Sequence, residues 1–202
     1  MKQALILFCL SLLLMTACSS NNSLKTQYYL LNSPTQENYT GESHKSKPSV
    51  TVTLIDLPDY LNQASLVLQL SEHQLHYSHF HMWAEPLQMS VTEALTHDLN
   101  AIDDRYDFNP LSTLSQRSAA TEVIVKISAF HATHQSQALL AGSYWLQDNS
   151  ENKAVTLHHF KLTIALASDG YAHAVEQMRK AITLLARDIT ANLTTVPAIT
   201  VR

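Results

Sequence analysis

The feature that most constrains the fold is an apolar stripe at helical spacing near the end of the chain. Its residues recur at intervals of three and four, which places their side chains on one face of an α-helix. They are Val175, Met178, Ile182, Leu185, Ile189 and Leu193. The helix is expected to start near Asp169 and Gly170 and to end before Pro197. Because one face of this helix is apolar, the chain must supply another apolar surface to bury it.

A second amphipathic helix, of about four turns, is predicted in the middle of the chain. Pro86 suits the first position of a helix, where its missing N–H costs nothing. The apolar stripe that follows consists of Leu87, Val91, Leu95, Leu99 and Ile102. The chain therefore contains two helices that each need a covering surface.

Alternating apolar and polar residues predict strands around these helices. Val50, Val52 and Leu54 alternate with threonines, for example, and 74–80 follows 65–70 closely enough to be its hairpin partner. The expected strands are 27–31, 50–57, 65–70, 74–80, 107–111, 122–132, 138–147 and 154–167, with a long loop over 32–49. Together these elements predict an α+β fold, a mostly antiparallel sheet with the two amphipathic helices packed on one face.

The first residues have the order of a bacterial signal peptide. Lys2 precedes an apolar run over 4–15, which is shorter than the roughly 20 residues that span a bilayer. Residues 14–18, Leu-Met-Thr-Ala-Cys, resemble the lipobox of lipoprotein precursors, in which small residues precede the cysteine that receives lipid. We expect a signal peptide over 1–17 and lipid attachment at Cys18. The alternatives are an ordinary cleaved signal peptide and a buried apolar strand that carries a chance cysteine.

The mature chain is predicted to be one periplasmic domain on a short lipid anchor. Residues 18–24 form the lipidated tether, of which 19–24 reach at most about 20 Å when extended, and 25–202 form a single α+β domain. Ser19 stands where an Asp would usually retain a lipoprotein in the inner membrane of enteric-type bacteria. The absence of Asp at this position predicts that the lipoprotein is anchored to the outer membrane and lies on its periplasmic face.

Composition excludes several classes of function. The net charge of −4 argues against nucleic-acid binding, and three glycines are too few for a glycine-rich phosphate loop. Cys9 leaves with the signal peptide and Cys18 is lipidated, so no cysteine remains for a disulfide. No serine has the flanking glycines of a nucleophile elbow, and Asp103–Asp104 fits a solvated helix end better than a catalytic pair. We therefore expect neither enzymatic activity nor a cofactor.

Histidine is abundant, with 11 residues in the chain. His76, His79 and His81 cluster, and a zinc site is one interpretation. However, no metal-ligand spacing such as HExxH occurs, and the adjacent His158 and His159 would point to opposite faces of a strand. Solvated histidines on polar faces are the favoured interpretation, and no metal site is expected.

Three segments together resemble a known family. They are Tyr-Tyr-Leu-Leu at 28–31, Leu-Pro-Asp-Tyr-Leu at 57–61 and Trp-Ala-Glu-Pro-Leu at 83–87. In this order behind a lipobox they resemble the PqiC/YmbA lipoproteins, the ABC-type transport auxiliary lipoprotein family. The resemblance extends over essentially the whole mature chain. Asn62–Gln63 stands where the family commonly carries an acidic-then-basic pair, so a contact made by that pair would differ here.

The resemblance implies a role as the outer-membrane component of an intermembrane lipid transport system. The implied partner is a periplasm-spanning protein with MCE (mammalian cell entry) domains, bound by a homo-oligomer of this chain, and the role supports envelope integrity. A rival from another class is a periplasmic carrier that holds one lipid or lipopeptide in its own apolar cavity. A histidine-rich metal buffer is a third.

Six residues of these motifs are the candidate partner-binding set, each with a structural alternative. Pro58, Asp59, Tyr60 and Leu61 would shape an exposed loop, or else a plain turn around a buried ring. Trp83 is a candidate hot spot, although a core aromatic covering the helix start is favoured. Glu85 would meet a partner's cation, or would complement the helix dipole, which is favoured.

Overall fold

The structure is a computed structural model that describes residues 25–33, 47–111, 121–148 and 155–193. The predicted signal peptide, Cys18 and the tether up to residue 24 lie outside the described residues, as does most of the predicted 32–49 loop. The described residues form an eight-stranded sheet and two α-helices, which confirms the predicted α+β class.

The observed elements follow the predicted order closely. In chain order they are β1 (Gln27–Tyr29), β2 (Ser49–Asp56), the 3-10 turn η2 (Asp59–Leu61), β3 (Ser65–Ser71), β4 (Gln74–Trp83), α2 (Leu87–Ile102), β5 (Asp107–Pro110), β6 (Thr121–Thr133), β7 (Gln137–Asp148), β8 (Thr156–Ala165) and α3 (Tyr171–Leu193). The largest departures are β8, which is two residues shorter than predicted at each end, β4, which runs on to Trp83, and β1, which ends at Tyr29 rather than at residue 31.

The sheet is organised around β6. Its long pairing with β7 is antiparallel, as are the pairings of β7 with β8 and of β3 with β4. On its other edge, β6 lies parallel to β2 along its first part and to β3 at Ala132. Two short edge strands complete the sheet, β5 parallel to β2 and β1 parallel to β4. The longest pairings are therefore antiparallel, as predicted.

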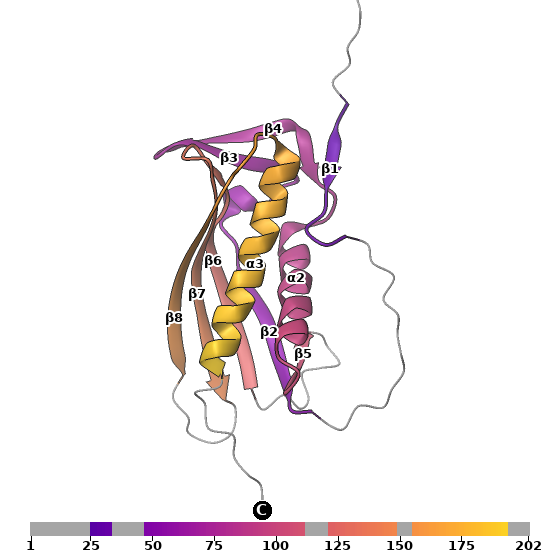
Figure 1. The fold of residues 1–202 in the computed structure, drawn as a ribbon, viewed down its shortest axis with the longest axis vertical. Coiled ribbons are helices and arrows are strands. Elements are labelled where there is room, and N and C mark those ends of the chain that lie inside the picture. The colour runs from indigo at the N-terminus through magenta and orange to yellow at the C-terminus, as the bar shows by residue number, and fades with distance from the viewer. Residues whose placement is uncertain (1–24, 34–46, 112–120, 149–154, 194–202) are drawn as a thin grey trace, which may run out of the picture.

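Both helices lie on the same side of this sheet (Figure 1), which confirms the predicted packing. Helix α3 runs along β7 and β8, while α2 lies beside it over β2 and β5. The two predicted apolar stripes face the sheet, and Ile182, Leu185 and Leu99 are among the most completely buried side chains. Ile102 is the exception, because it lies at the last residue of α2 and is 40% exposed. The sheet therefore supplies the covering surface that the two amphipathic helices require.

Gly142 occupies a tight position where β7 passes a bulge in β6. The pairing register shifts between Ile127 and Ala129, and a Cβ at Gly142 would lie 2.1 Å from the carbonyl oxygen of Lys126. The ring of Phe160, its partner on β8, covers the same spot, 2.9 Å from that Cβ position. A strand glycine is required here because backbone and ring approach too closely for any side chain.

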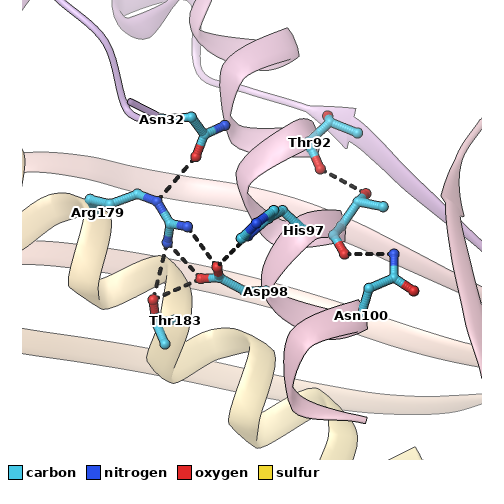
Figure 2. Close-up of polar contacts among 8 residues, drawn as sticks. Asn32, Thr92, His97, Asp98, Asn100, Arg179 and Thr183 are labelled. Atoms are coloured by element: carbon cyan, nitrogen blue, oxygen red, sulfur yellow. Dashed lines mark hydrogen bonds and ion pairs between the residues drawn. The ribbon is translucent and has the colours of Figure 1, made fainter. Parts of the chain in front are cut away.

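A partly buried ion pair joins the two helices (Figure 2). Arg179 of α3 donates two hydrogen bonds, of 2.5 and 2.6 Å, to the carboxylate of Asp98 on α2. Thr183 donates to the same carboxylate, and Arg179 also donates to Asn32 in the segment that follows β1. Burial alone would raise the pKa of Asp98, but these hydrogen bonds outweigh it and hold the pKa below its usual range. The network fixes α2, α3 and the N-terminal segment to one another.

Candidate partner-binding site

The three motifs of the sequence meet at one place in the fold. The backbone N–H of Ala84 donates to the carbonyl oxygen of Tyr29 at 2.9 Å, which joins the first motif to the third. The N–H of Trp83 donates to the carbonyl oxygen of Ala64 at 2.6 Å, which joins the loop after the second motif to the third. Segments that lie far apart in the sequence therefore assemble into a single structure.

A half-open pocket of roughly 410 Å³ lies where these segments meet. Its lining comes from two stretches, the loop 61–64 and the entry into α2 over 83–88. This volume is at the lower end of the range for small-molecule sites. The side chains around it are mostly apolar or uncharged amides, with Glu85 as the one carboxylate among the lining residues.

The loop is shaped by the η2 turn. Leu61 N–H donates to the Pro58 carbonyl oxygen at 2.8 Å, and Asn62 N–H donates to that of Asp59 at 3.1 Å. This turn rotates Leu61 into the core, where it is only 2% exposed, and leaves Asp59 at the surface. The Asn62 side chain donates back to the Leu57 carbonyl oxygen. The loop is therefore held by its own hydrogen bonds.

Tyr60 is half-buried and is also held by the body of the protein. Its hydroxyl donates to the carbonyl oxygen of Ser128 on β6 at 3.2 Å, and its ring lies 6.0 Å from that of His131. Burial, together with the neighbouring Tyr77, raises the pKa of Tyr60. Tyr60 therefore anchors the loop to β6, and its side chain is only partly available to a partner.

Trp83 lies in the core at 6% exposure, beneath the start of α2. This position matches the predicted core aromatic that covers the helix N-terminus. Trp83 also lines the pocket, but its low exposure leaves little of the residue for a partner to contact.

Glu85 is exposed just before α2 begins. Its carboxylate accepts a hydrogen bond of 2.9 Å from the hydroxyl of Ser90 in the first turns of the helix. A negative charge at this position is favourable to the helix dipole. Asp59 and Glu85 thus place two carboxylates at the surface around the pocket, and the side chains of Asn62 and Gln63 are exposed between them in the sequence.

The candidate set therefore separates into two groups. Pro58, Tyr60, Leu61 and Trp83 build the loop and the wall, whereas Asp59 and Glu85 are available to a partner. The structure adds Ala64, Ala84 and Gln88 as exposed lining residues outside the candidate set. The signal in the sequence was position alone, since Ala84 lies within the third motif, Gln88 directly follows it, and Ala64 lies three residues after the second motif.

The histidines do not assemble into a metal site in the part of the chain that the structure describes, where no group of three or more potential ligands comes together. His81 accepts a hydrogen bond from the Tyr29 hydroxyl or donates one to it, at 2.7 Å, and stacks on Tyr171. His158 stacks on Tyr144, while its neighbour His159 pairs with the Ser143 hydroxyl. These histidines serve as packing and hydrogen-bonding groups.

Within 25–33, 47–111, 121–148 and 155–193, no helix has both the length and the apolar character needed to cross a membrane. The fold and its pocket thus define a small α+β domain whose distinctive surface is built from three short motifs. The chain belongs to the family of ABC-type transport auxiliary lipoprotein components, whose model matches residues 29–190. This confirms the resemblance seen in the sequence.

Two solved structures share the fold. One is an uncharacterised protein with 19% identity and a TM-score of 0.67, and the match covers 84% of this chain and 99% of that one. The other is a DUF330 protein from Xanthomonas campestris with 12% identity and a TM-score of 0.54, covering 88% and 94% of the two chains. At these identities the likeness establishes the fold alone. No curated protein matches the sequence.

Proposed function

We propose that this lipoprotein docks a periplasm-spanning MCE-domain protein to the periplasmic face of the outer membrane, as a non-enzymatic subunit of an intermembrane lipid transport system. The observation that carries the proposal is the half-open pocket between the end of the second motif and the third motif, which the first motif braces through the backbone hydrogen bond from Ala84 to Tyr29. Family membership supports it, because an auxiliary component of a transporter needs a surface that binds the rest of the transporter.

The short anchor supports the same role. If Cys18 carries lipid, residues 19–24 hold the domain within about 20 Å of its membrane. The domain then cannot carry cargo across the periplasm by itself and needs a partner that spans the gap. Ser19 after the cysteine supports the outer membrane as that membrane, because an Asp usually stands there in lipoproteins that stay in the inner membrane of enteric-type bacteria.

The pocket favours recognition of an uncharged or basic segment. The exposed carboxylate of Glu85 repels acidic groups, and the amides of Gln63 and Gln88 offer both donors and acceptors. The Gln63 side chain is already oriented by a hydrogen bond to the Tyr60 carbonyl oxygen at 2.9 Å. We propose that several copies of the chain present this pocket together, as a homo-oligomer around one partner.

A pull-down of the mature lipoprotein from envelope extract of its own cell tests the proposal. The expected result is specific recovery of an MCE-domain protein. If the extract contains an MCE-domain protein and the lipoprotein is recovered without it, that result would contradict the docking role. Stoichiometric co-purification of a lipid with the isolated domain would instead support the carrier alternative.

A further inference from the structure

Four of the exposed large apolar side chains lie on the β3–β4 hairpin and on β1, while others, such as Val155 and Leu157, lie near the start of β8. On the β3–β4 hairpin, Leu70 is 49% exposed, and Tyr77 and Phe80 are about as accessible. On the neighbouring strand β1, Tyr28 is 69% exposed. Strand β1 pairs with the end of β4, Gln27 opposite His81, whereas Leu70 lies beside the turn at the other end of the hairpin.

The same hairpin is almost free of charge. Between residues 65 and 83, Glu72 is the single Asp, Glu, Lys or Arg, whereas such residues make up 15% of the chain as a whole. A surface with few charges loses little hydration when it approaches an apolar phase. Tyrosine and phenylalanine side chains, with their large apolar rings, are also well suited to the interface between lipid and water.

The chain enters the domain at the end that carries this hairpin. Figure 1 shows β1 beside the β3–β4 hairpin, at the end where α3 begins. The ring of Tyr171, the first residue of α3, stacks on the ring of His81 in β4. The start of α3 therefore lies beside the part of β4 that pairs with β1. Helix α3 has 23 residues and is therefore about 35 Å long. The opposite end, with Leu193 and the start of β8, is thus farther from β1 than the tether of about 20 Å can reach.

We propose that the β3–β4 hairpin and β1 form a membrane-contact surface, which rests on the same bilayer that holds the lipid anchor. The occupant is the lipid interface, because the tether brings it to this end. The inference rests on the lipid anchoring in the proposed function. It goes further, since it orients the domain with the hairpin toward the membrane and the far ends of β8 and α3 toward the periplasm.

The tether explains why a few side chains suffice. Leu70, Tyr77, Phe80 and Tyr28 alone would give weak binding to a membrane, since each buries only part of its surface. Once the chain is anchored, the contact becomes an intramolecular event at an effective concentration on the order of millimolar. The contact is therefore expected for the lipidated protein and not for a domain without its anchor.

A depth measurement on the lipidated protein tests this orientation. Cys18 is the last cysteine of the chain, so Leu70→Cys introduces the one free thiol of the mature lipoprotein for an environment-sensitive fluorophore. Leu157→Cys is the matched control, because Leu157 is 47% exposed but lies at the far end of β8. Both proteins are reconstituted into vesicles of phosphatidylethanolamine and phosphatidylglycerol that contain lipids with a quencher on the acyl chain.

The expected result is emission from position 70 that is shifted to the blue and quenched several-fold more than emission from position 157. Equal quenching at the two positions in protein that floats with the vesicles would overturn the contact surface and leave the docking role intact. A blue shift at position 70 without lipid quenching would also overturn it, because protein would then cover the hairpin. Failure of the protein to float would overturn the anchor and this inference together.

Discussion

At the scale of single residues, the structure distinguishes side chains that build the motifs from those that a partner can reach. Leu61 and Trp83 lie inside, although the sequence offered both as candidates for binding. A substitution such as Leu61→Ala would therefore report on stability rather than on binding. Binding is better tested at exposed positions such as Ala84.

Truncation of Ile182 tests the packing of α3. Ile182 is fully buried in the apolar stripe, so Ile182→Ala is expected to lower the free energy of unfolding by about 2–5 kcal/mol. Leu184 in the same helix is exposed, and Leu184→Ala is expected to change the free energy of unfolding by less than about 0.5 kcal/mol. Urea denaturation measures both. Equal costs at the two sites would contradict the observed orientation of the helix.

His131 is expected to make the domain sensitive to mild acid. Burial lowers the pKa of this buried histidine, against a weaker opposing effect of its contact with the Ala132 carbonyl oxygen. Below a pH of about 6.5, the unfolded chain takes up a proton that the folded protein resists. The free energy of unfolding should therefore fall as the pH drops through that value.

The measurement is denaturant unfolding at a series of pH values, for the wild type and for His131→Gln. The variant is expected to lose part of the slope of stability against pH in this range, even if its stability is lower throughout. An unchanged slope would show that His131 is not the group responsible.

At the scale of elements, the Asp98–Arg179 pair holds α2 against α3. Asp98 is nearly buried, whereas Arg179 keeps some contact with solvent. A buried pair contributes little net stability compared with an apolar replacement, but removal of one partner leaves a charge without compensation. The pair therefore acts mainly to fix the register of the two helices and the segment at Asn32.

Asp98→Asn is expected to lower the free energy of unfolding by about 3 kcal/mol, the lower part of the range for a broken buried pair, because Arg179 is partly solvated. The double replacement Asp98→Leu with Arg179→Met should recover most of that loss, since no unpaired charge remains. Thermal and urea unfolding of the three proteins provide the measurement. A double variant that is no more stable than Asp98→Asn would contradict this account of the pair.

Most of the elements were predictable from sequence, because both helices and the strands carry strong periodicity. The directions of β1, β2 and β5 were not predictable, since an alternating pattern is the same whether the neighbouring strand runs parallel or antiparallel. The pocket was missed for a related reason. The 3-10 turn at Asp59–Leu61 interrupts the alternation and rotates Leu61 inward, and only the fold brings it beside Trp83.

At the scale of the whole molecule, two surfaces have separate proposed roles, one in contact with the membrane and one in binding the partner. In the proposed arrangement, the hairpin end contacts the anchoring membrane, and the pocket at 61–64 and 83–88 receives the spanning partner. Both depend on a body that the Asp98 network and the buried stripes hold in one arrangement. The pocket is the central element of this account, because docking fails without it even when the anchor remains.

The most direct test of the central claim is a binding titration between the mature lipoprotein and the MCE-domain protein of the same cell. Ala84→Arg places a long cation at the exposed mouth of the pocket, and Ala101→Arg makes the same change at an exposed alanine near the end of α2. Circular dichroism confirms that both variants are folded. The account predicts at least about a tenfold loss of affinity for Ala84→Arg, equivalent to about 1.4 kcal/mol, and wild-type affinity for Ala101→Arg. Wild-type affinity for a folded Ala84→Arg protein would contradict it.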